Sequence, residues 1–199
     1  MAGERVNQIE VSELGFANDR EILVLDERRK IATSRTYHRL LGLKGKITPA
    51  GDATINGNPW NSPEALALVR AAVGQGATLM RYDGAERFDV LPLLIATDGA
   101  ISHMGCDGRR LRPNIIVGGV EGLEERRWPD RRLRVGEVIV YASQLRARCV
   151  MTTYDPDTLK QDLGVLKSIV SKLDGVMALD CSVVKGGIVN VGDPVSVLE

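Results

Sequence analysis

The chain has 199 residues, of which 26 are acidic and 26 are basic, so its formal net charge is zero. This length can bury a substantial core in one large or two small domains. The balanced charge gives no general attraction to nucleic acid or to an anionic membrane surface. The apolar runs are only strand-length, and the three cysteines are widely spaced. We therefore expect no nucleic-acid partner, no membrane span, no disulfide framework and a cytoplasmic location.

Strand patterns dominate the first sixty residues. The run 21–25 (EILVL), the charged turn 26–30 and the run 31–34 together predict a hairpin. Residues 40–48 predict a further strand, and the turn-rich segment 51–59 predicts a loop or a short hairpin.

Three helices are expected. Ser62 as N-cap and Pro63 in the first turn open the first helix, and Gly74 closes it. A second, short helix is predicted from about residue 97 to residue 105. The third is expected from about residue 158 to residue 173, with one apolar stripe made of Leu163, Leu166, Ile169, Val170 and Leu173.

Two segments in the last third of the chain are similar in sequence: residues 134–140 (RVGEVIV) and residues 190–197 (NVGDPVSV). Each segment is a turn followed by alternating apolar residues, which is typical of a strand that starts in a small barrel and also of an ordinary hairpin. Pro194 cannot donate a ladder hydrogen bond, so it should lie at the first residue of a strand or at a sheet edge.

Five features occur along the chain in an order that resembles one family, and one of them also indicates a branch of that family. The segments are 112–117 (RPNIIV), Trp128, 133–137 (LRVGE), 148–158 (RCVMTTYDPDT) and 187–193 (GIVNVGD). This order resembles the MOSC family, the C-terminal domains of molybdenum-cofactor sulfurases. The form TTxDPDT looks most like the branch of the mitochondrial amidoxime-reducing component and its bacterial relatives, and residues 15–35 and 88–94 also fit that branch.

The resemblance implies a β-rich α+β fold, in which a MOSC-type β-barrel with peripheral helices follows a packed β-rich N-terminal region. By this division, residues 1–60 form the N-terminal β region and residues 61–199 form the MOSC domain, with an approximate boundary inside one compact unit.

Cys149 is the principal candidate for chemistry. In the branch that this chain resembles, the matching cysteine is a thiolate ligand of molybdenum beside the cofactor's dithiolene. The residue type suits that role, because a soft thiolate favours a sulfur-rich transition-metal site. The nearby Arg146 and Arg148 favour the thiolate, although Arg148 points away from Cys149 if the strand is extended. A buried structural thiol is the alternative reading.

Further site residues follow from the resemblance. Arg112 and Asn114 are expected at the cofactor, where a guanidinium suits a phosphate or the edge of a pterin ring. Arg35 resembles another residue that contacts the cofactor phosphate. Arg148 and Thr152 are further candidates for cofactor binding.

Two other segments have a structural and a functional reading. Thr97 and Asp98 lie at a predicted helix start and could present N–H groups to an anion, but capping explains them equally well. Asp155 lies in a predicted turn and helix cap, and in the family this position lies beside the metal, which makes Asp155 a catalytic candidate. His103 and Cys106 have a suggestive spacing for zinc, but two further ligands are missing nearby.

The function that the resemblance implies is that of a molybdenum-cofactor (molybdopterin) oxidoreductase that reduces N-hydroxylated or N-oxide compounds. The alternative is a non-catalytic carrier of sulfur, as a persulfide, or of the cofactor. Three departures imply weaker cofactor retention: Ala147 replaces a serine, Leu159 replaces a glycine, and the N-terminal Lys-Ser stretch of the branch does not precede this sequence.

Such an enzyme needs an external source of electrons. Three scattered cysteines are too few for an ordinary iron–sulfur cluster, and no strand is followed by the glycine pattern of a dinucleotide-binding loop. The resemblance together with this argument predicts a separate flavin or iron–sulfur protein as electron donor. The arginine-rich stretch 126–134 is a candidate docking face for it.

Overall fold

A computed structural model describes residues 1–198, which form two units. Unit 1 contains Met1–Arg5, Asn18–Arg87 and Pro156–Leu159. Unit 2 contains Val6–Ala17, Phe88–Asp155 and the chain from Lys160 onward. The expected division into residues 1–60 and 61–199 rests on family resemblance rather than on spatial clustering, and it stays a prediction.

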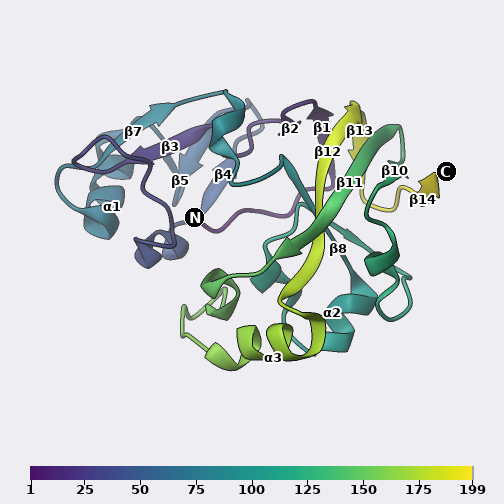
Figure 1. Ribbon diagram of the computed structural model, residues 1–199. Helices are drawn as coiled ribbons and strands as arrows, with labels where there is room; N and C mark the ends of the chain where they lie inside the picture. Colours follow the sequence, from purple (N-terminus) through teal and green to yellow (C-terminus); the bar gives the residue numbers. More distant parts are fainter. Residues whose placement is uncertain (199) are drawn as a thin grey trace. The chain divides into compact units, whose positions relative to one another are not determined.

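In unit 1, β3 (Ile22–Leu25) pairs antiparallel with β7 (Thr78–Arg81) (Figure 1). The hairpin predicted over residues 21–34 is therefore mostly wrong, because only a single bridge joins Leu25 to Ile31. The partner of β3 is supplied by a strand more than fifty residues away. A local pattern cannot identify such a partner.

The rest of unit 1 is built from β4 (Gly45–Ile47), β5 (Ala53–Ile55), β6 (Asn58–Pro59) and α1 (Pro63–Val73). The predicted short hairpin is present as β5 and β6. The predicted first helix is also present, since the Ser62 side chain accepts a hydrogen bond from the Ala65 N–H at 3.2 Å. The strand expected over residues 40–48 is half wrong, because it starts with a 3-10 helix, η1 (His38–Gly42).

Unit 2 contains a six-stranded sheet in the order β14-β10-β11-β12-β8-β9, with only β8 and β9 parallel. Its strands are β8 (Leu93–Thr97), β9 (Ile115–Val117), β10 (Arg131–Val135), β11 (Val138–Ala147), β12 (Val176–Lys185) and β14 (Val195–Leu198). Pro194 immediately precedes the edge strand β14, which confirms its expected position. A second sheet has the order β13-β1-β2, with β1 (Gln8–Ser12), β2 (Gly15–Phe16) and β13 (Gly187–Asn190).

β11 and β12 are the longest strands and bend along their length (Figure 1). Register shifts interrupt their pairing at three places, as β-bulges do where a strand must curve. One apolar core lies on one face of this sheet and includes Leu93, Leu133, Val140 and Cys181. Burying each large aliphatic side chain of this kind stabilises the fold by about 1.5–3 kcal/mol.

A further core joins unit 2's two α-helices to the sheet. It includes Ala96, Ala100, Ile169, Leu173 and Met177, from β8, α2 (Asp98–Met104), α3 (Leu163–Leu173) and β12. Three short 3-10 helices complete the unit: η3 (Gly108–Leu111), η4 (Glu124–Arg127) and η5 (Val150–Thr153).

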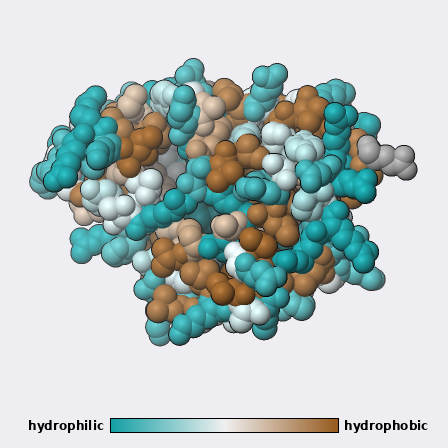
Figure 2. Space-filling view, viewed as in Figure 1, coloured by the Kyte–Doolittle hydropathy of each residue, from teal (hydrophilic) through white to brown (hydrophobic). Residues whose placement is uncertain are grey.

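α2 agrees with its prediction, whereas α3 begins five residues later than expected. Asp162 is its N-cap and accepts a hydrogen bond from the Gly164 N–H at 2.8 Å. Only part of the predicted stripe is buried, since Leu163 and Val170 are more than half exposed. Figure 2 shows apolar patches between polar side chains on the part of the face where Figure 1 places α3.

The predicted β-rich α+β class, with a curled sheet and peripheral helices, is confirmed. Over residues 1–198, every helix is too short or too polar to cross a membrane.

Candidate functional site

Cys149 lies just beyond the end of β11, where the chain leaves the long strand pair and enters η5. The Arg148 N–H donates to the Gly175 carbonyl at 2.8 Å, which fixes the chain on the N-terminal side of the cysteine. On the other side, the Thr152 N–H and Oγ1 both donate to the Cys149 carbonyl, at 3.1 and 2.9 Å. The Cys149 thiol is half-buried and does not cap η5. The backbone of the cysteine is thus held on both sides, and the residue as a whole is partly exposed.

Thr152 is therefore a structural neighbour of Cys149. Its side chain is 1% exposed, and its hydroxyl is used in closing the first turn of η5. The predicted contact between Thr152 and a cofactor stays a prediction.

Arg148, next to Cys149 in the chain, has a guanidinium that is only partly hydrogen-bonded. Its Nη2 donates to the Leu111 carbonyl at 2.6 Å, but its buried Nε has no hydrogen-bond partner within residues 1–198. Burial, reinforced by the charge of Arg146, lowers the pKa of Arg148 to about 10, so the group is still a cation at neutral pH. A buried cationic donor without a partner is costly, and an anionic ligand would compensate it.

Asp155 forms an ion pair with Arg110. The Arg110 Nη2 donates to Asp155 Oδ2 at 3.0 Å, and the Arg110 Nη1 donates to the Thr153 carbonyl at 2.9 Å. Asp155 was expected to act on a metal-bound water, and that role stays a prediction. Sequence reasoning missed Arg110, because no local pattern links residues separated by 43 and 45 positions.

Arg112 and Asn114 follow η3 directly. Arg112 is exposed and has a left-handed backbone with φ of 57°, and its N–H bonds to the Arg109 carbonyl. Asn114 continues the parallel ladder between β8 and β9, because its Oδ1 accepts from the Leu94 N–H at 2.9 Å and its own N–H donates to the Leu94 carbonyl. The residue before Arg112 is Leu111, whose carbonyl binds Arg148, so the structure brings Arg112 to the same η3–η5 region as Cys149.

Thr97 and Asp98 are used by the fold. Thr97 is fully buried, and both its N–H and its hydroxyl donate to Glu125 Oε2, at 3.0 and 2.7 Å. Glu125 Oε1 accepts from the Ala178 N–H at 2.9 Å. Asp98 accepts from the Gly119 and Val120 N–H groups, which lowers its pKa. Of the two readings of Thr97 and Asp98, the geometry supports the structural one.

No local pattern in the sequence indicates the role of Glu125. It lies in the charged run 124–127 (EERR), where an exposed side chain is the ordinary expectation. In the structure it is 1% exposed and joins the end of β8 to β12.

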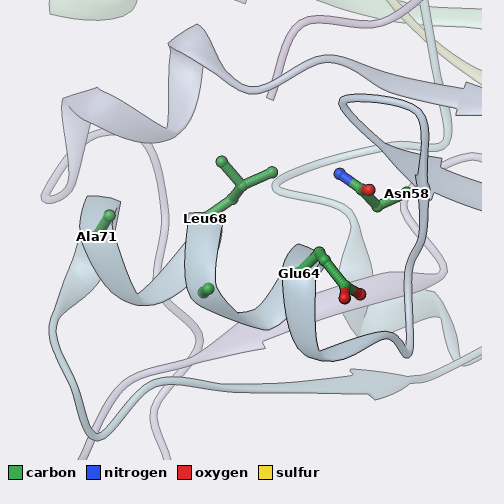
Figure 3. Close-up of a pocket in the computed structure, with 5 residues that line it drawn as sticks. Asn58, Glu64, Leu68 and Ala71 are labelled. Carbon is green, nitrogen blue, oxygen red and sulfur yellow. The ribbon is translucent and has the colours of Figure 1, made fainter.

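Arg35 belongs to unit 1, in the turn that follows β3, and its side chain is exposed. Its expected approach to the cofactor phosphate stays a prediction. Unit 1 also has an open hollow of about 470 Å³ over α1, lined by Asn58, Glu64, Ala67, Leu68 and Ala71 (Figure 3). Its lining contains no cation and none of the predicted site residues, so it does not suit an anionic cofactor.

A second arginine near the end of β11 lies between two carboxylates. Arg146 Nη1 donates to Asp180 Oδ1 at 3.0 Å, and its Nη2 pairs with the more exposed Asp89. Asp180 is 2% exposed, and burial raises its pKa although the charge of Arg146 opposes this. The prediction that Arg146 supports the thiolate must therefore be qualified, because its charge is already paired.

The two other cysteines are less suited to bind a metal. Burial raises the pKa of Cys106, and it raises the pKa of Cys181 to about 12. Both therefore remain protonated thiols near neutral pH. Over the described part of the chain, no three His, Cys, Asp or Glu side chains are grouped as metal ligands, so the spacing of His103 and Cys106 has no structural counterpart as a zinc site.

The arginine-rich stretch 126–134 is not uniform. Arg126 donates to the Leu173 and Val176 carbonyls, both at 3.3 Å, and so anchors the end of α3. Arg127 pairs with Glu124. The exposed arginines of β10, at positions 131, 132 and 134, are what remains of the predicted docking face, which stays a prediction.

The donor set at Cys149 fits a sulfur-rich, anionic molybdenum cofactor. It offers the thiol of a partly exposed cysteine and a neighbouring guanidinium whose Nε lacks a partner among the described residues. A metal that is already bound by the dithiolene of a pterin needs few protein ligands, so a single thiolate is a sufficient anchor. Cys149 would hold the metal with Arg148 next to it in the chain, while the predicted contact of Arg112 with the cofactor stays a prediction.

Comparison with known proteins identifies the family of the chain. The MOSC domain family matches residues 97–196, half of the chain. The human mitochondrial amidoxime reducing component 2 is 36% identical in an alignment of 126 positions, which covers 54% of this chain and 37% of that protein. Human mitochondrial amidoxime-reducing component 1 is 30% identical in an alignment of 90 positions, which covers 40% of this chain and 26% of that protein. The matches thus span about a third of the length of these relatives.

One solved structure resembles nearly the whole chain. The YUAD protein of Bacillus subtilis (APC1665) superposes with a TM-score of 0.50 over 98% of this chain and 86% of its own, at 14% identity. At this identity the likeness concerns the fold.

Proposed function

This chain belongs to the MOSC domain family, and from this premise we propose that it binds a molybdenum cofactor through the Cys149 thiolate and reduces N-hydroxylated compounds. The observation that carries the proposal is the half-buried Cys149 thiol beside Arg148, whose buried Nε lacks a partner among residues 1–198. The relatives named as amidoxime reducing components support the substrate class.

When bound, the cofactor supplies a metal that can accept the oxygen of an N–O bond in a two-electron reduction. The protein's residues bind and orient it. Cys149 provides the thiolate ligand, and its carbonyl is fixed by Thr152. Arg148 provides a cation that remains charged at neutral pH and would offset part of the cofactor's negative charge.

Each turnover converts an N–OH group into N–H and water and consumes two electrons and two protons. With three cysteines in the sequence and no dinucleotide-binding glycine pattern, we propose that a separate flavin or iron–sulfur protein supplies the electrons. An artificial donor such as reduced viologen replaces that partner in an assay.

The test is metal analysis of protein made in a host that synthesises the cofactor, followed by viologen-driven reduction of an amidoxime. Cys149→Ser should abolish both molybdenum retention and turnover, because a hydroxyl is a poor ligand for a soft metal site. Cys106→Ser and Cys181→Ser, measured per folded chain, should keep both. Equal molybdenum in all three variants would contradict the proposal, and full occupancy without turnover would favour a cofactor or sulfur carrier.

A further inference from the structure

Two arginines cross between η3 and η5 in opposite directions. Arg110, in η3, reaches the far end of η5, and Arg148, just before η5, reaches back to the Leu111 carbonyl at the end of η3. We propose that Arg110 is a positioning residue, which fixes η5 and thereby the Cys149 ligand. This inference rests on the proposed function for its consequence in catalysis, but not for its geometry.

Arg110 is built for this role. Its side chain is only 12% exposed, and its two Nη atoms serve two different acceptors, the Thr153 carbonyl at 2.9 Å and Asp155 Oδ2 at 3.0 Å. The planar guanidinium holds the two acceptors at a fixed spacing, which a single ammonium group cannot do. The carboxylate makes the second bond a charge-assisted one, which is stronger than a bond between neutral groups.

The position of Thr153 is transmitted to Cys149 through one 3-10 turn. Thr152 donates twice to the Cys149 carbonyl, and Thr153 Oγ1 donates to the Val150 carbonyl at 2.7 Å. Thr152 and Thr153 are both buried, so this turn has little freedom to rearrange. Moving Thr153 therefore moves Cys149, whose other side is fixed by the bond between Arg148 and Gly175.

Arg109 offers a matched control in the same short helix. It is 58% exposed and pairs at 2.7 Å with Asp107, two residues earlier. Replacing it removes one positive charge from η3 but leaves both Arg110 bonds in place.

The experiment compares Arg110→Gln, Arg110→Lys and Arg109→Gln. In cofactor-free protein, hydrogen exchange of the peptide that contains Thr152 and Asp155 reports the fixation of η5. Arg110→Gln should speed exchange there about tenfold or more, while distant core peptides keep their protection. Arg110→Lys should recover part of the protection, and Arg109→Gln should behave as wild type.

In cofactor-loaded protein, Arg110→Gln should lower molybdenum retention or kcat about 10- to 100-fold, as is usual when the groups that orient a metal ligand are removed. KM should change little, and Arg110→Lys should rescue part of kcat. Unchanged exchange in Arg110→Gln would overturn the positioning role. Faster exchange in a protein whose wild type retains no molybdenum would support the positioning role and contradict the proposed function instead. If Arg110→Gln does not fold, Asp155→Asn is the alternative variant, because it removes the charge of one of the two Arg110 acceptors. It should also speed hydrogen exchange in η5, but by less.

Discussion

The start of α2 and the segment around Cys149 both place polar side chains at the end of a strand, but they use them differently. At α2, the Thr97 hydroxyl, the Thr97 N–H and both Glu125 oxygens are bonded to one another or to the backbone. At Cys149, a guanidinium Nε is buried without a partner among residues 1–198. The first arrangement is complete in itself, whereas the second has capacity for a ligand.

Hydrogen-bond satisfaction thus distinguishes the start of α2 from the segment around Cys149 more clearly than residue type does. Buried polar groups are normally satisfied, so a group left without a partner requires a reason. The N–H groups of Gly119 and Val120 are also satisfied, because both donate to the Asp98 carboxylate. An anionic ligand would find no free donor among these groups at the start of α2. Beside Cys149 it would find the cationic Arg148.

The largest expected effect comes from opening the closed network. Glu125→Leu leaves two N–H groups and one hydroxyl without their acceptor, and each such buried group costs about 1–3 kcal/mol. We expect the free energy of unfolding of the cofactor-free protein to fall by about 3 kcal/mol or more in chemical denaturation. Glu124→Leu, which changes an exposed neighbour in the same run, is the control and should cost little. Similar losses in both variants would contradict the proposed importance of the network.

The opposite behaviour is expected at the incomplete site. Arg148→Met costs the bond to the Leu111 carbonyl, but it also removes a charged group whose desolvation and unpaired Nε are unfavourable, so the two effects oppose each other. The unfolding free energy of the cofactor-free protein should change by no more than about 1 kcal/mol, while molybdenum content falls sharply. Arg134→Met, on the exposed side of β10, should change neither quantity. A strongly destabilised Arg148→Met variant that still binds molybdenum would show that Arg148 serves the fold, as Glu125 does, and not a ligand.

The smallest effect concerns pH. Backbone N–H groups lower the pKa of Asp98 in the folded protein, so its stabilising contribution is present above the unfolded value of about 3.9 and is lost as pH falls through the folded value. Asp98→Asn keeps an acceptor oxygen but cannot ionise. The stability difference between wild type and Asp98→Asn should therefore be greater at neutral pH than under acidic conditions. A difference that is constant with pH would show that the charge of Asp98 is unimportant.

Local signals account for the parts of the structure that the sequence predicted correctly. The first helix is bounded by Ser62 and Gly74, whose caps lie within a few residues of the helix itself. The hairpin β5–β6 turns at Asn56 and Gly57, both with positive φ, as its sequence favours. The family resemblance singled out Cys149 and Arg148 as site candidates, and their roles at a cofactor stay predictions.

Long-range pairing accounts for what was missed. The partner of β3, the bonds from Arg110 to η5 and the burial of Glu125 all join segments that are distant in the chain. The late start of α3 has a subtler cause. Asp155, Asp157 and Asp162 can each cap a helix, and only the bridge between Tyr154 and Gln161 shows that the chain is still turning back before Asp162.

The long pairing of β11 with β12 has a consequence for how this protein can diversify. Residues 148–175, which contain Cys149, η5 and α3, form the connection between these two strands. Both ends of the connection are held by the pair of Ala147 with Val176 and by the bond from Arg148 to Gly175. Insertions and substitutions in the exposed middle of such a connection leave the strand register intact. The middle of this segment can therefore change in length and sequence while the backbone at Cys149 keeps its place beside the strand pair.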